Sequence, residues 1–185
     1  RDWSSDVCSS DLLQYMALKK ERIADRDKES IKNGLSKFTG VSRRFEYKGK
    51  LNGASVYDDY GHHPTEIVAT SKALMNKKYR KSWIVFQPHT YSRTKLLLDD
   101  FAKALLNFDN IIILDIYAAR EDNIYNISSE DLVNKIKSLC KDAMYIKDFD
   151  ECISFLKANV QKNDIVLTQG AGTVTEIGKR LVSKD

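Results

Sequence analysis

Short apolar runs alternate along most of the chain with longer segments in which apolar residues recur every three or four positions. A short continuous apolar run is typical of a strand covered on both faces, and the longer period is typical of an amphipathic helix. The predicted strands are 54–57, 83–86, 111–114, 144–146 and 165–167. The predicted helices are approximately 64–76, 94–108, 129–139, 149–159 and 174–182. Strands and helices that alternate through short loops predict a doubly wound α/β domain with a mostly parallel sheet.

A β-hairpin is predicted at the start of this domain. Segments 45–47 and 50–57 have strand patterns, and Asn52-Gly53 lies within the second of them. Asn-Gly favours the tight turns that hairpins use. The expected fold is therefore a Rossmann-like α/β sheet that carries an N-terminal hairpin.

The first forty residues have a different pattern. Residues 1–12 are rich in Ser and Asp, show no apolar period, and lack the basic and apolar segments of a signal peptide. We interpret them as a spurious or foreign extension. From Leu13 to about Leu35 the pattern is helical, with Ile31, Leu35 and Phe38 three or four positions apart.

Composition excludes several classes of protein. Hydrophobic residues make up 42% of the 185 positions and charged residues 30%, so the chain can bury a core. No apolar run approaches the roughly 20 residues that span a bilayer, so no membrane segment is predicted. The net charge of +4 has one tight basic cluster, at 77–81, between a predicted helix and a strand. A solvated loop is favoured there over a nucleic-acid patch.

The three cysteines, Cys8, Cys140 and Cys152, are odd in number and lack C-x-x-C spacing. This argues against a zinc site and against a disulfide framework. Cys140 and Cys152 fall in helical patterns, where a small buried side chain is favoured over a nucleophile. A reducing cytoplasm is the expected location.

Side chains suited to ligand binding follow the predicted strand 54–57. The run reads Asp58-Asp59-Tyr60-Gly61-His62-His63-Pro64-Thr65-Glu66. Pro64 suits a first helical turn because it has no N–H to lose, and Glu66 places negative charge near the positive end of the helix dipole. Open α/β sheets bind ligands where strands end and helices begin, so a ligand site is predicted at this turn.

A second polar run follows the predicted strand 83–86 and reads Gln87-Pro88-His89-Thr90-Tyr91-Ser92-Arg93-Thr94. All three histidines of the chain, His62, His63 and His89, lie in these two runs. Scattered surface histidines would seldom be placed this way, so we expect the two loops to form one ligand site. The alternative is that these side chains are hydrogen-bonded turn and capping residues.

Two further runs follow predicted strands, Asp115-Ile116-Tyr117-Ala118-Ala119 and Gly170-Ala171-Gly172. Together with the first two, and in this order, they resemble the C-terminal domain of the Mur ligase family. The run from Gln87 to Thr94 favours the UDP-N-acetylmuramate–L-alanine ligases of that family over siblings that add later amino acids or recycle muramoyl peptides. The resemblance implies ATP-dependent amide-bond formation in peptidoglycan synthesis, with UDP-N-acetylmuramate and L-alanine as substrates and ATP and Mg²⁺ as cofactors.

The resemblance also implies a division of the chain into domains. Residues 13–42 resemble the last helix and linker of the family's central ATP-binding domain, and residues 43–185 resemble its amino-acid-binding C-terminal domain. The family's N-terminal domain, which holds the UDP-sugar, and the part of the central domain with the phosphate-binding loop and most metal ligands have no counterpart in this sequence. The chain is therefore expected to be inactive alone, and no metal ligand is predicted in it.

The nucleotide side of the site is implied to contain Arg44, Asp59, Tyr60 and His62. In the family the second arginine of an Arg-Arg-Phe triplet reaches the nucleotide phosphates, and that residue here is Arg44. Asp59 and Tyr60 are expected to face the nucleotide, and His62 is expected near its phosphates. For Arg43-Arg44, a solvent-facing basic pair at a hinge stays open as the alternative.

The substrate side is implied to contain His89 and Arg93, which are also the candidate catalytic residues. The guanidinium of Arg93 offers a fork for a carboxylate or acyl phosphate. A neutral His89 imidazole could accept a proton from the alanine ammonium group. Tyr117 and Glu121 are expected to line the alanine pocket.

Structural roles stay open for Asp58, which could cap backbone donors, and for His63, which could pack beside Pro64. Arg120 stands where many family members have glycine, and Thr173 where others often have an acid, so selectivity for alanine is less defined at that wall.

Two other functions are weighed against the ligase. The first is a stand-alone α/β module that binds a nucleotide or an amino acid. The second is an NAD-dependent oxidoreductase, which is disfavoured because Gly170-Ala171-Gly172 lacks the third glycine of a dinucleotide fingerprint. The phosphate-binding pattern G-x-x-x-x-G-K-[ST] does not occur in the sequence either. Such a pattern encoded upstream of Leu13 in the same reading frame would favour the ligase over the module.

Overall fold

The computed structural model describes residues 25–36 and 41–183. The chain divides into two compact units, residues 1–40 and residues 41–185. In the first unit the described element is helix α2, Asp25–Ser36, which agrees with the end of the helical pattern predicted there. Residues 1–12, Cys8, the start of that pattern and Phe38 lie outside the described residues. The assignment of residues 13–42 to a central domain stays a prediction.

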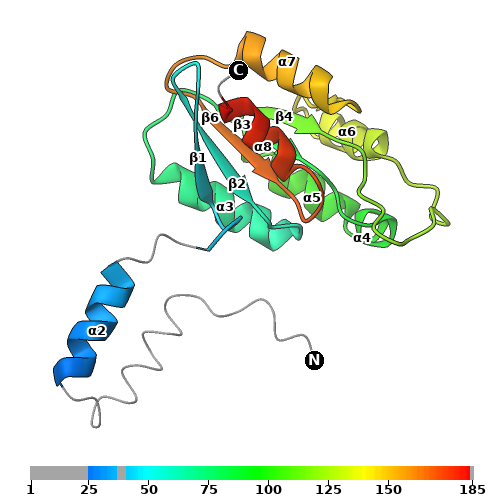
Figure 1. The fold of residues 1–185 in the computed structure, drawn as a ribbon. Helices are drawn as coiled ribbons and strands as arrows, with labels where there is room; N and C mark the ends of the chain where they lie inside the picture. The colour runs from blue at the N-terminus through cyan, green and yellow to red at the C-terminus, as the bar shows by residue number, and fades with distance from the viewer. Residues whose placement is uncertain (1–24, 37–40, 184–185) are drawn as a thin grey trace. The chain divides into compact units, whose positions relative to one another are not determined.

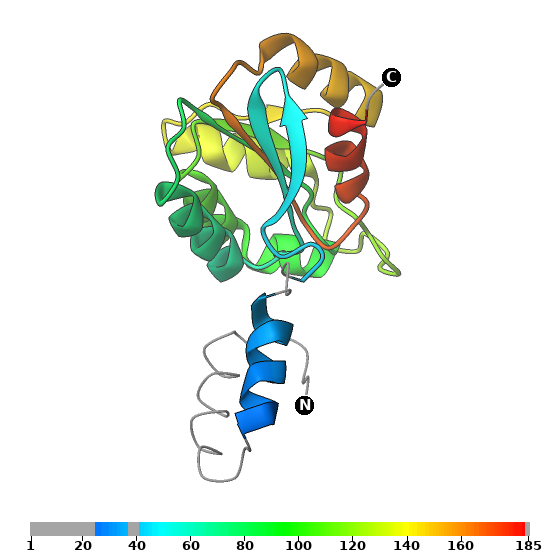
Figure 2. The same ribbon diagram turned by 60° about the vertical axis from the view of Figure 1, so that its left-hand side comes forward.

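The second unit is built on a six-stranded sheet in the order β1-β2-β6-β3-β4-β5 (Figure 1). Its strands are β1 (Glu46–Leu51), β2 (Ala54–Asp59), β3 (Ser82–Phe86), β4 (Asn110–Ile113), β5 (Met144–Tyr145) and β6 (Ile165–Gln169). β1 pairs antiparallel with β2, and all other pairs are parallel. The predicted fold class, a mostly parallel α/β sheet with an N-terminal hairpin, is confirmed. Figure 2 shows the hairpin at the edge of the sheet.

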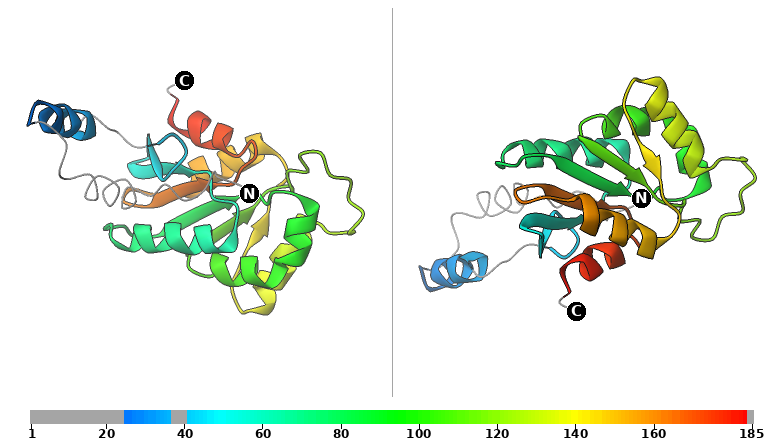
Figure 3. Two further views of the ribbon diagram at one scale, coloured as in Figure 1. Left: turned by 90° about the horizontal axis from the view of Figure 1, so that it is seen from below. Right: turned by 90° about the horizontal axis from the view of Figure 1, so that it is seen from above.

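Helices cover both faces of the sheet (Figure 3). They are α3 (Pro64–Met75), α4 (Tyr91–Leu96), α5 (Leu98–Leu105), α6 (Ser129–Ser138), α7 (Phe149–Asn159) and α8 (Thr175–Val182). One core joins Ile67, Phe101 and Leu132 of α3, α5 and α6 to the sheet, and the other joins Leu156 and Ile177 of α7 and α8 to the opposite face. The central strands β3 and β6 are buried along their whole length, which explains their continuous apolar sequences.

Local sequence accounts for the main boundaries. At the hairpin turn, Asn52 and Gly53 both have positive φ, as the tight turn requires. Ser128 caps α6 in a capping box with Asp131. Pro64 occupies the first turn of α3, and His63 is the N-cap of that helix. A structural role for His63 is therefore supported, but as a helix cap with an exposed side chain and not through packing beside Pro64.

Two predictions about helices are wrong in detail. The segment predicted as one helix from about Thr94 to 108 forms α4 and α5, with a break at Leu97. α4 begins three residues earlier than predicted, because the Oγ1 atom of Thr90 accepts the N–H of Arg93 as an N-cap. Cys140 is exposed rather than buried, because α6 ends at Ser138 and Cys140 follows it at positive φ.

Cys152 is buried in α7, and burial raises the pKa of its thiol to about 12, so it is an inert core residue as predicted. The basic segment 77–81 is a mostly exposed loop. None of the helices within residues 25–36 and 41–183 is long and apolar enough to cross a membrane.

Candidate functional site

The four polar motifs lie at the same edge of the sheet. The parallel strands β2, β3 and β6 end at Asp59, Phe86 and Gln169, which are paired in register, and β4 ends beside β3. Each motif begins within two residues of one of these four ends. The motifs therefore gather at the carboxyl edge of the parallel sheet, where open α/β sheets bind ligands.

Four rings from three loops form a continuous row at this edge, which we call the ring row. Its members in order are Tyr60, His62, His89 and Tyr117. Ring centroids are 5.4 Å apart for Tyr60 and His62, 5.5 Å for His62 and His89, and 5.7 Å for His89 and Tyr117. The last pair is stacked, with an interplanar angle of 23°. The two histidine-bearing loops therefore meet, and the loop after β4 joins them.

Arg93 of α4 holds His89 in one tautomer. Its Nη1 atom lies 3.1 Å from Nδ1 of His89. A guanidinium has no acceptor, so Nδ1 must accept this hydrogen bond and the neutral imidazole carries its proton on Nε2. Burial, the positive charge of Arg93 and the neighbouring His62 lower the pKa of His89. The pKa of His62 is also lowered, by burial and by Arg93, so both imidazoles resist protonation.

Arg44 is the exposed member of the Arg43-Arg44 pair, with 43% of its side chain accessible. Its guanidinium lies 5.8 Å from the centroid of the Tyr60 ring, and its Nη1 atom lies 3.5 Å from Oε1 of Glu66. Exposed ion pairs of this length are weak, so the guanidinium is available to an anion.

Asp59 is turned inward, with 7% exposure. Its carboxylate accepts hydrogen bonds from Phe45 N at 2.8 Å, Gly61 N at 2.7 Å and Gln169 Nε2 at 3.2 Å. Burial raises its pKa, while the two backbone N–H groups act in the opposite direction. In this structure Asp59 supports the loop that carries Tyr60.

Asp58 is fully buried and bonds side chains rather than backbone donors. It accepts hydrogen bonds from Thr168 Oγ1 at 2.7 Å, Thr175 Oγ1 at 2.9 Å and Arg43 Nε at 3.2 Å. A structural role for Asp58 is thus supported. Its partners are side chains, however, and not the backbone donors that we expected it to cap.

Tyr117 and Glu121 lie in the loop after β4 and differ in orientation. Tyr117 is 37% exposed and stacks on His89. Glu121 accepts hydrogen bonds from Ser92 N at 2.9 Å and Ser92 Oγ at 2.6 Å, and these bonds hold its pKa low. Its carboxylate therefore fastens the loop to the start of α4, while the Tyr117 ring faces the site.

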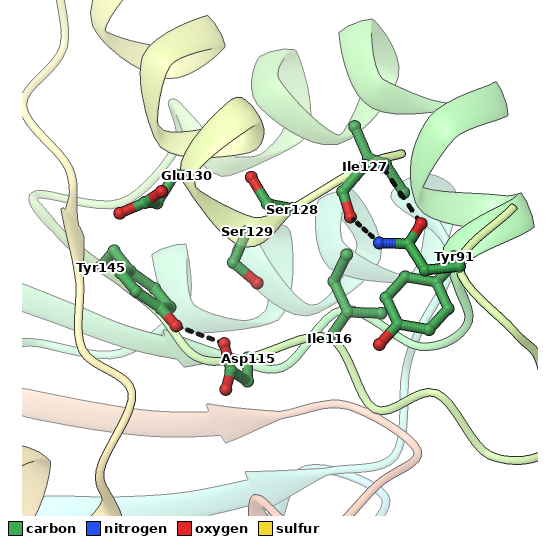
Figure 4. A pocket seen from close by; sticks show the side chains of 9 residues that line it. Tyr91, Asp115, Ile116, Ile127, Ser128, Ser129, Glu130 and Tyr145 are labelled. Carbon is green, nitrogen blue, oxygen red and sulfur yellow. Dashed lines mark hydrogen bonds between the residues drawn. The ribbon is translucent and has the colours of Figure 1, made fainter. Parts of the chain in front are cut away.

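A separate pocket of about 290 Å³ is lined by residues of this loop and of α4, α6 and β5 (Figure 4). The phenol of Tyr145 donates a hydrogen bond to Asp115, and the same contact and burial raise the pKa of Tyr145 to about 12. The remaining lining residues are Tyr91, Ile116, Asn123, Ile127, Ser128, Ser129 and Glu130. None of the predicted site residues lines this pocket.

A family model described as Mur ligase, glutamate ligase domain, matches residues 43–172. The chain belongs to the Mur ligase family. Among its relatives, the UDP-N-acetylmuramate–L-alanine ligase of Lachnospira eligens is 49% identical over 84% of this chain and 34% of the relative. That of Acetivibrio thermocellus is 49% identical over 82% of this chain and 32% of the relative. The chain thus spans about a third of the length of these relatives.

Solved structures of the Mur ligase family agree with the fold. The crystal structure of UDP-N-acetylmuramate-alanine ligase MurC from Thermotoga maritima is 27% identical, with a TM-score of 0.62 over 80% of this chain and 31% of that one. A murein peptide ligase from Psychrobacter arcticus, 22% identical, has a TM-score of 0.63 over the same shares and supports the fold alone.

Three residues at this edge of the sheet have positions that we did not predict. Gln87 is buried, and its Oε1 atom accepts the N–H of Val174 at 3.0 Å at the start of α8. Gly172 lies between Gln87 and Tyr117, so close that a Cβ atom there would lie 2.4 Å from Gln87 Oε1 and 2.7 Å from Tyr117 Cγ. Gln87 could have been identified from the sequence, because it is a polar residue that directly follows a buried strand. Arg43, the third of them, is partly buried and donates a hydrogen bond from Nε to Asp58.

Proposed function

We propose that this chain forms the C-terminal part of an ATP-dependent ligase that joins L-alanine to UDP-N-acetylmuramate in peptidoglycan synthesis. The observation on which the proposal rests is the contact between Arg93 and His89, the third ring of the ring row. A guanidinium fork beside a half-buried neutral imidazole suits a reaction between an activated carboxylate and an amine. Relatives 49% identical to this chain are named for that reaction, which supports the choice of substrates.

Arg93 and His89 have linked roles in the proposed reaction. A carboxylate or acyl phosphate is a stronger acceptor for a guanidinium than a neutral imidazole is. Binding of the muramoyl anion would therefore draw Arg93 away from His89 Nδ1. The freed Nδ1 atom could then accept a proton from the alanine ammonium group. Tyr117 forms one wall of the alanine pocket, and Glu121 acts by fixing the loop that carries Tyr117.

The nucleotide is proposed to meet Arg44, Tyr60 and His62. An exposed guanidinium beside an exposed ring and an imidazole could contact part of a nucleoside triphosphate. ATP supplies the phosphoryl group that activates the carboxylate. Asp59 contributes to nucleotide binding through the loop that it supports. Within the described ranges, no group of three or more His, Cys, Asp or Glu is arranged to hold a metal ion, so we propose that the Mg²⁺ ligands lie in other parts of the ligase.

We propose a cytoplasmic location for the enzyme, because its substrates are nucleotide-linked and because the described cysteines, Cys140 and Cys152, are free thiols. The partners of this unit are the N-terminal and central domains of the same ligase, without which it is inactive. Neither nucleic acid nor membrane is part of the proposed function.

The test is a chimaera in which residues 41–185 replace the corresponding third of the Lachnospira eligens relative. Phosphate release is measured with ATP, L-alanine and UDP-N-acetylmuramate, and with each omitted in turn. We expect release that requires all three substrates in the chimaera and none in the 185-residue chain alone. Activity with a peptide in place of L-alanine, or with a UDP-muramoyl peptide in place of UDP-N-acetylmuramate, would indicate a sibling ligase. An inactive, folded chimaera would favour a stand-alone binding module.

A further inference from the structure

We propose that Arg43 is a positioning residue that holds the Tyr60 loop and the Gly170–Gly172 turn together as one wall of the site, whereas Arg44 is left to meet the ligand. The proposal rests on the proposed function only for the identity of the ligands. The family resemblance implies a role for Arg44 alone and none for Arg43. In the structure both guanidinium groups lie near the Tyr60 ring, but their other partners differ.

The side chain of Arg43 joins segments more than a hundred residues apart. Its Nε atom donates to Oδ2 of Asp58 at 3.2 Å, and its Nη2 atom donates to the carbonyl oxygen of Gly170 at 2.6 Å. The carbonyl oxygen of Gly172 lies 3.4 Å from the same Nη2 atom. The guanidinium also lies 5.0 Å from the centroid of the Tyr60 ring. With 22% of the side chain exposed, these hydrogen bonds are shielded from water.

The backbone of Arg43 is fixed to the Tyr60 loop and to β1. Its carbonyl oxygen accepts the N–H of Tyr60 at 2.6 Å, and its own N–H donates to Oε2 of Glu46 at 2.7 Å. Arg43 and Phe45 both have positive φ, at 59° and 47°, a conformation that costs a non-glycine residue on the order of 1 kcal/mol. Such strain persists where surrounding contacts fix the backbone, and here the carboxylates of Glu46, Asp58 and Asp59 fix it.

Movement of the glycine turn would reach the centre of the site. Gly172 packs directly against the ring of Tyr117, and Tyr117 stacks on His89. Arg43 is therefore connected to both ends of the ring row, to Tyr60 by direct contact and to Tyr117 through Gly172, and Tyr117 in turn stacks on His89. Loss of Arg43 should loosen both the nucleotide end and the amino-acid end. Arg44 contacts Tyr60 and Glu66 but not the glycine turn, so its loss should affect the nucleotide end alone.

The first test measures the wall without any ligand, by amide hydrogen exchange and NMR on the 185-residue chain. Arg43→Lys keeps the charge beside Asp58 but loses the fork that reaches both Asp58 and Gly170. We expect exchange at Tyr60 and at residues 170–174 to accelerate by about tenfold, the effect of losing one charged hydrogen bond. The His89 ring resonances should also shift. Arg44→Ala is the matched control and should leave the glycine turn and His89 unchanged. Equal responses in the two variants would overturn the proposal.

The second test uses the active chimaera and separates positioning from folding. Arg43→Lys should raise the KM for ATP and the KM for L-alanine together, and Arg44→Ala should raise the KM for ATP only. A merely structural arginine would reduce the amount of folded enzyme, so kcat would fall with both KM values unchanged, and that result would contradict the proposal. An inactive unsubstituted chimaera would contradict the proposed function, while the exchange measurement would still decide the role of Arg43.

Discussion

Buried aspartates lie at both edges of the parallel sheet, and the two edges differ in what surrounds them. At the edge where strands begin, Asp164 is 1% exposed, and its Oδ2 atom accepts hydrogen bonds from three donors. These are Arg80 Nη2 at 2.8 Å, Gln161 N at 3.0 Å and Trp83 Nε1 at 3.1 Å. At the edge where strands end, Asp58 is equally buried and also bonds three donors.

The difference is a second layer of side chains. Around Asp164 the donors come from β3 and from the loops that lead into β3 and β6, and they connect the starts of these two strands. Around Asp58 and Asp59 the inner network carries an outer layer that points away from it, formed by Arg44, the ring row and Arg93. A buried polar network by itself thus contributes to stability. A buried network that also supports a layer of half-exposed ionisable and aromatic side chains indicates a candidate binding site.

The largest expected effect is that of Asp164→Ala, which removes the shared acceptor of three donors, the buried Trp83 Nε1 among them. The free energy of unfolding should fall by about 3 kcal/mol, because a buried indole N–H loses its partner and Arg80 loses its carboxylate. Urea denaturation of this chain measures it. Asp164→Asn keeps one acceptor oxygen and should cost less. Ring resonances of His62 and His89 should be unchanged in the folded variant, and a loss below about 1 kcal/mol would contradict the role of the network.

Arg93→Ala tests the edge where the strands end, and it should reduce activity strongly and stability very little. We expect the chimaera to lose most of its ligation activity, about 30-fold in kcat/KM, which corresponds to about 2 kcal/mol for a charged hydrogen bond. The free energy of unfolding should change by less than about 0.5 kcal/mol, because among the described residues the Arg93 side chain has hydrogen bonds only with the side chain and carbonyl oxygen of His89. Lys95→Ala, exposed on the same helix, is the control. Unchanged turnover would remove Arg93 from the site.

The sequence was sufficient to predict most elements, since their signals are local. Helix α7 matches its predicted bounds, and it begins after a capping Asp148. The hairpin and the capped start of α6 follow from Asn52-Gly53 and Ser128 in the same way. The break at Leu97 was missed because Leu96, Leu97 and Leu98 form an uninterrupted apolar run that hides the change of helix.

The orientation of neighbouring polar residues was beyond sequence reasoning. Arg43 and Arg44 are identical residues, as are Asp58 and Asp59, and each pair contains residues with different surroundings. What separates them is distant, since Asp58 bonds Thr168 and Thr175 while Asp59 bonds Gln169. The sequence located the motifs at one edge of the sheet, but only the packed structure shows which members form the inner network.

Gly172→Ala tests the packing contact between the buried residue Gln87 and the outer residue Tyr117. A methyl group there must displace Gln87 or Tyr117, so we expect a loss of about 1.5 kcal/mol in the free energy of unfolding, typical of overpacking. The ring contact between Tyr117 and His89, observed as nuclear Overhauser effects, should weaken. Gly34→Ala in exposed helix α2 meets no atom within 4 Å and should leave that ring contact unchanged. An intact ring contact in Gly172→Ala would show that the glycine does not position Tyr117.

The smallest expected effect is the pH dependence that His89 gives to the site. Its folded pKa lies below the ordinary 6.5, through burial and the charge of Arg93, so the folded state takes up the proton less readily than the unfolded chain. His89 therefore costs no stability above pH 6.5, and its cost grows as the pH falls below 6.5 toward the folded pKa. Arg93→Ala should raise the pKa of His89 and move the imidazole away from the fixed Nε2–H tautomer, both measurable by NMR titration of the ring nitrogens. Lys95→Ala should change neither. A His89 titration that is the same with and without Arg93 would mean that the guanidinium does not occupy Nδ1 in solution, and His89 would then be free to act as a base before any anion binds.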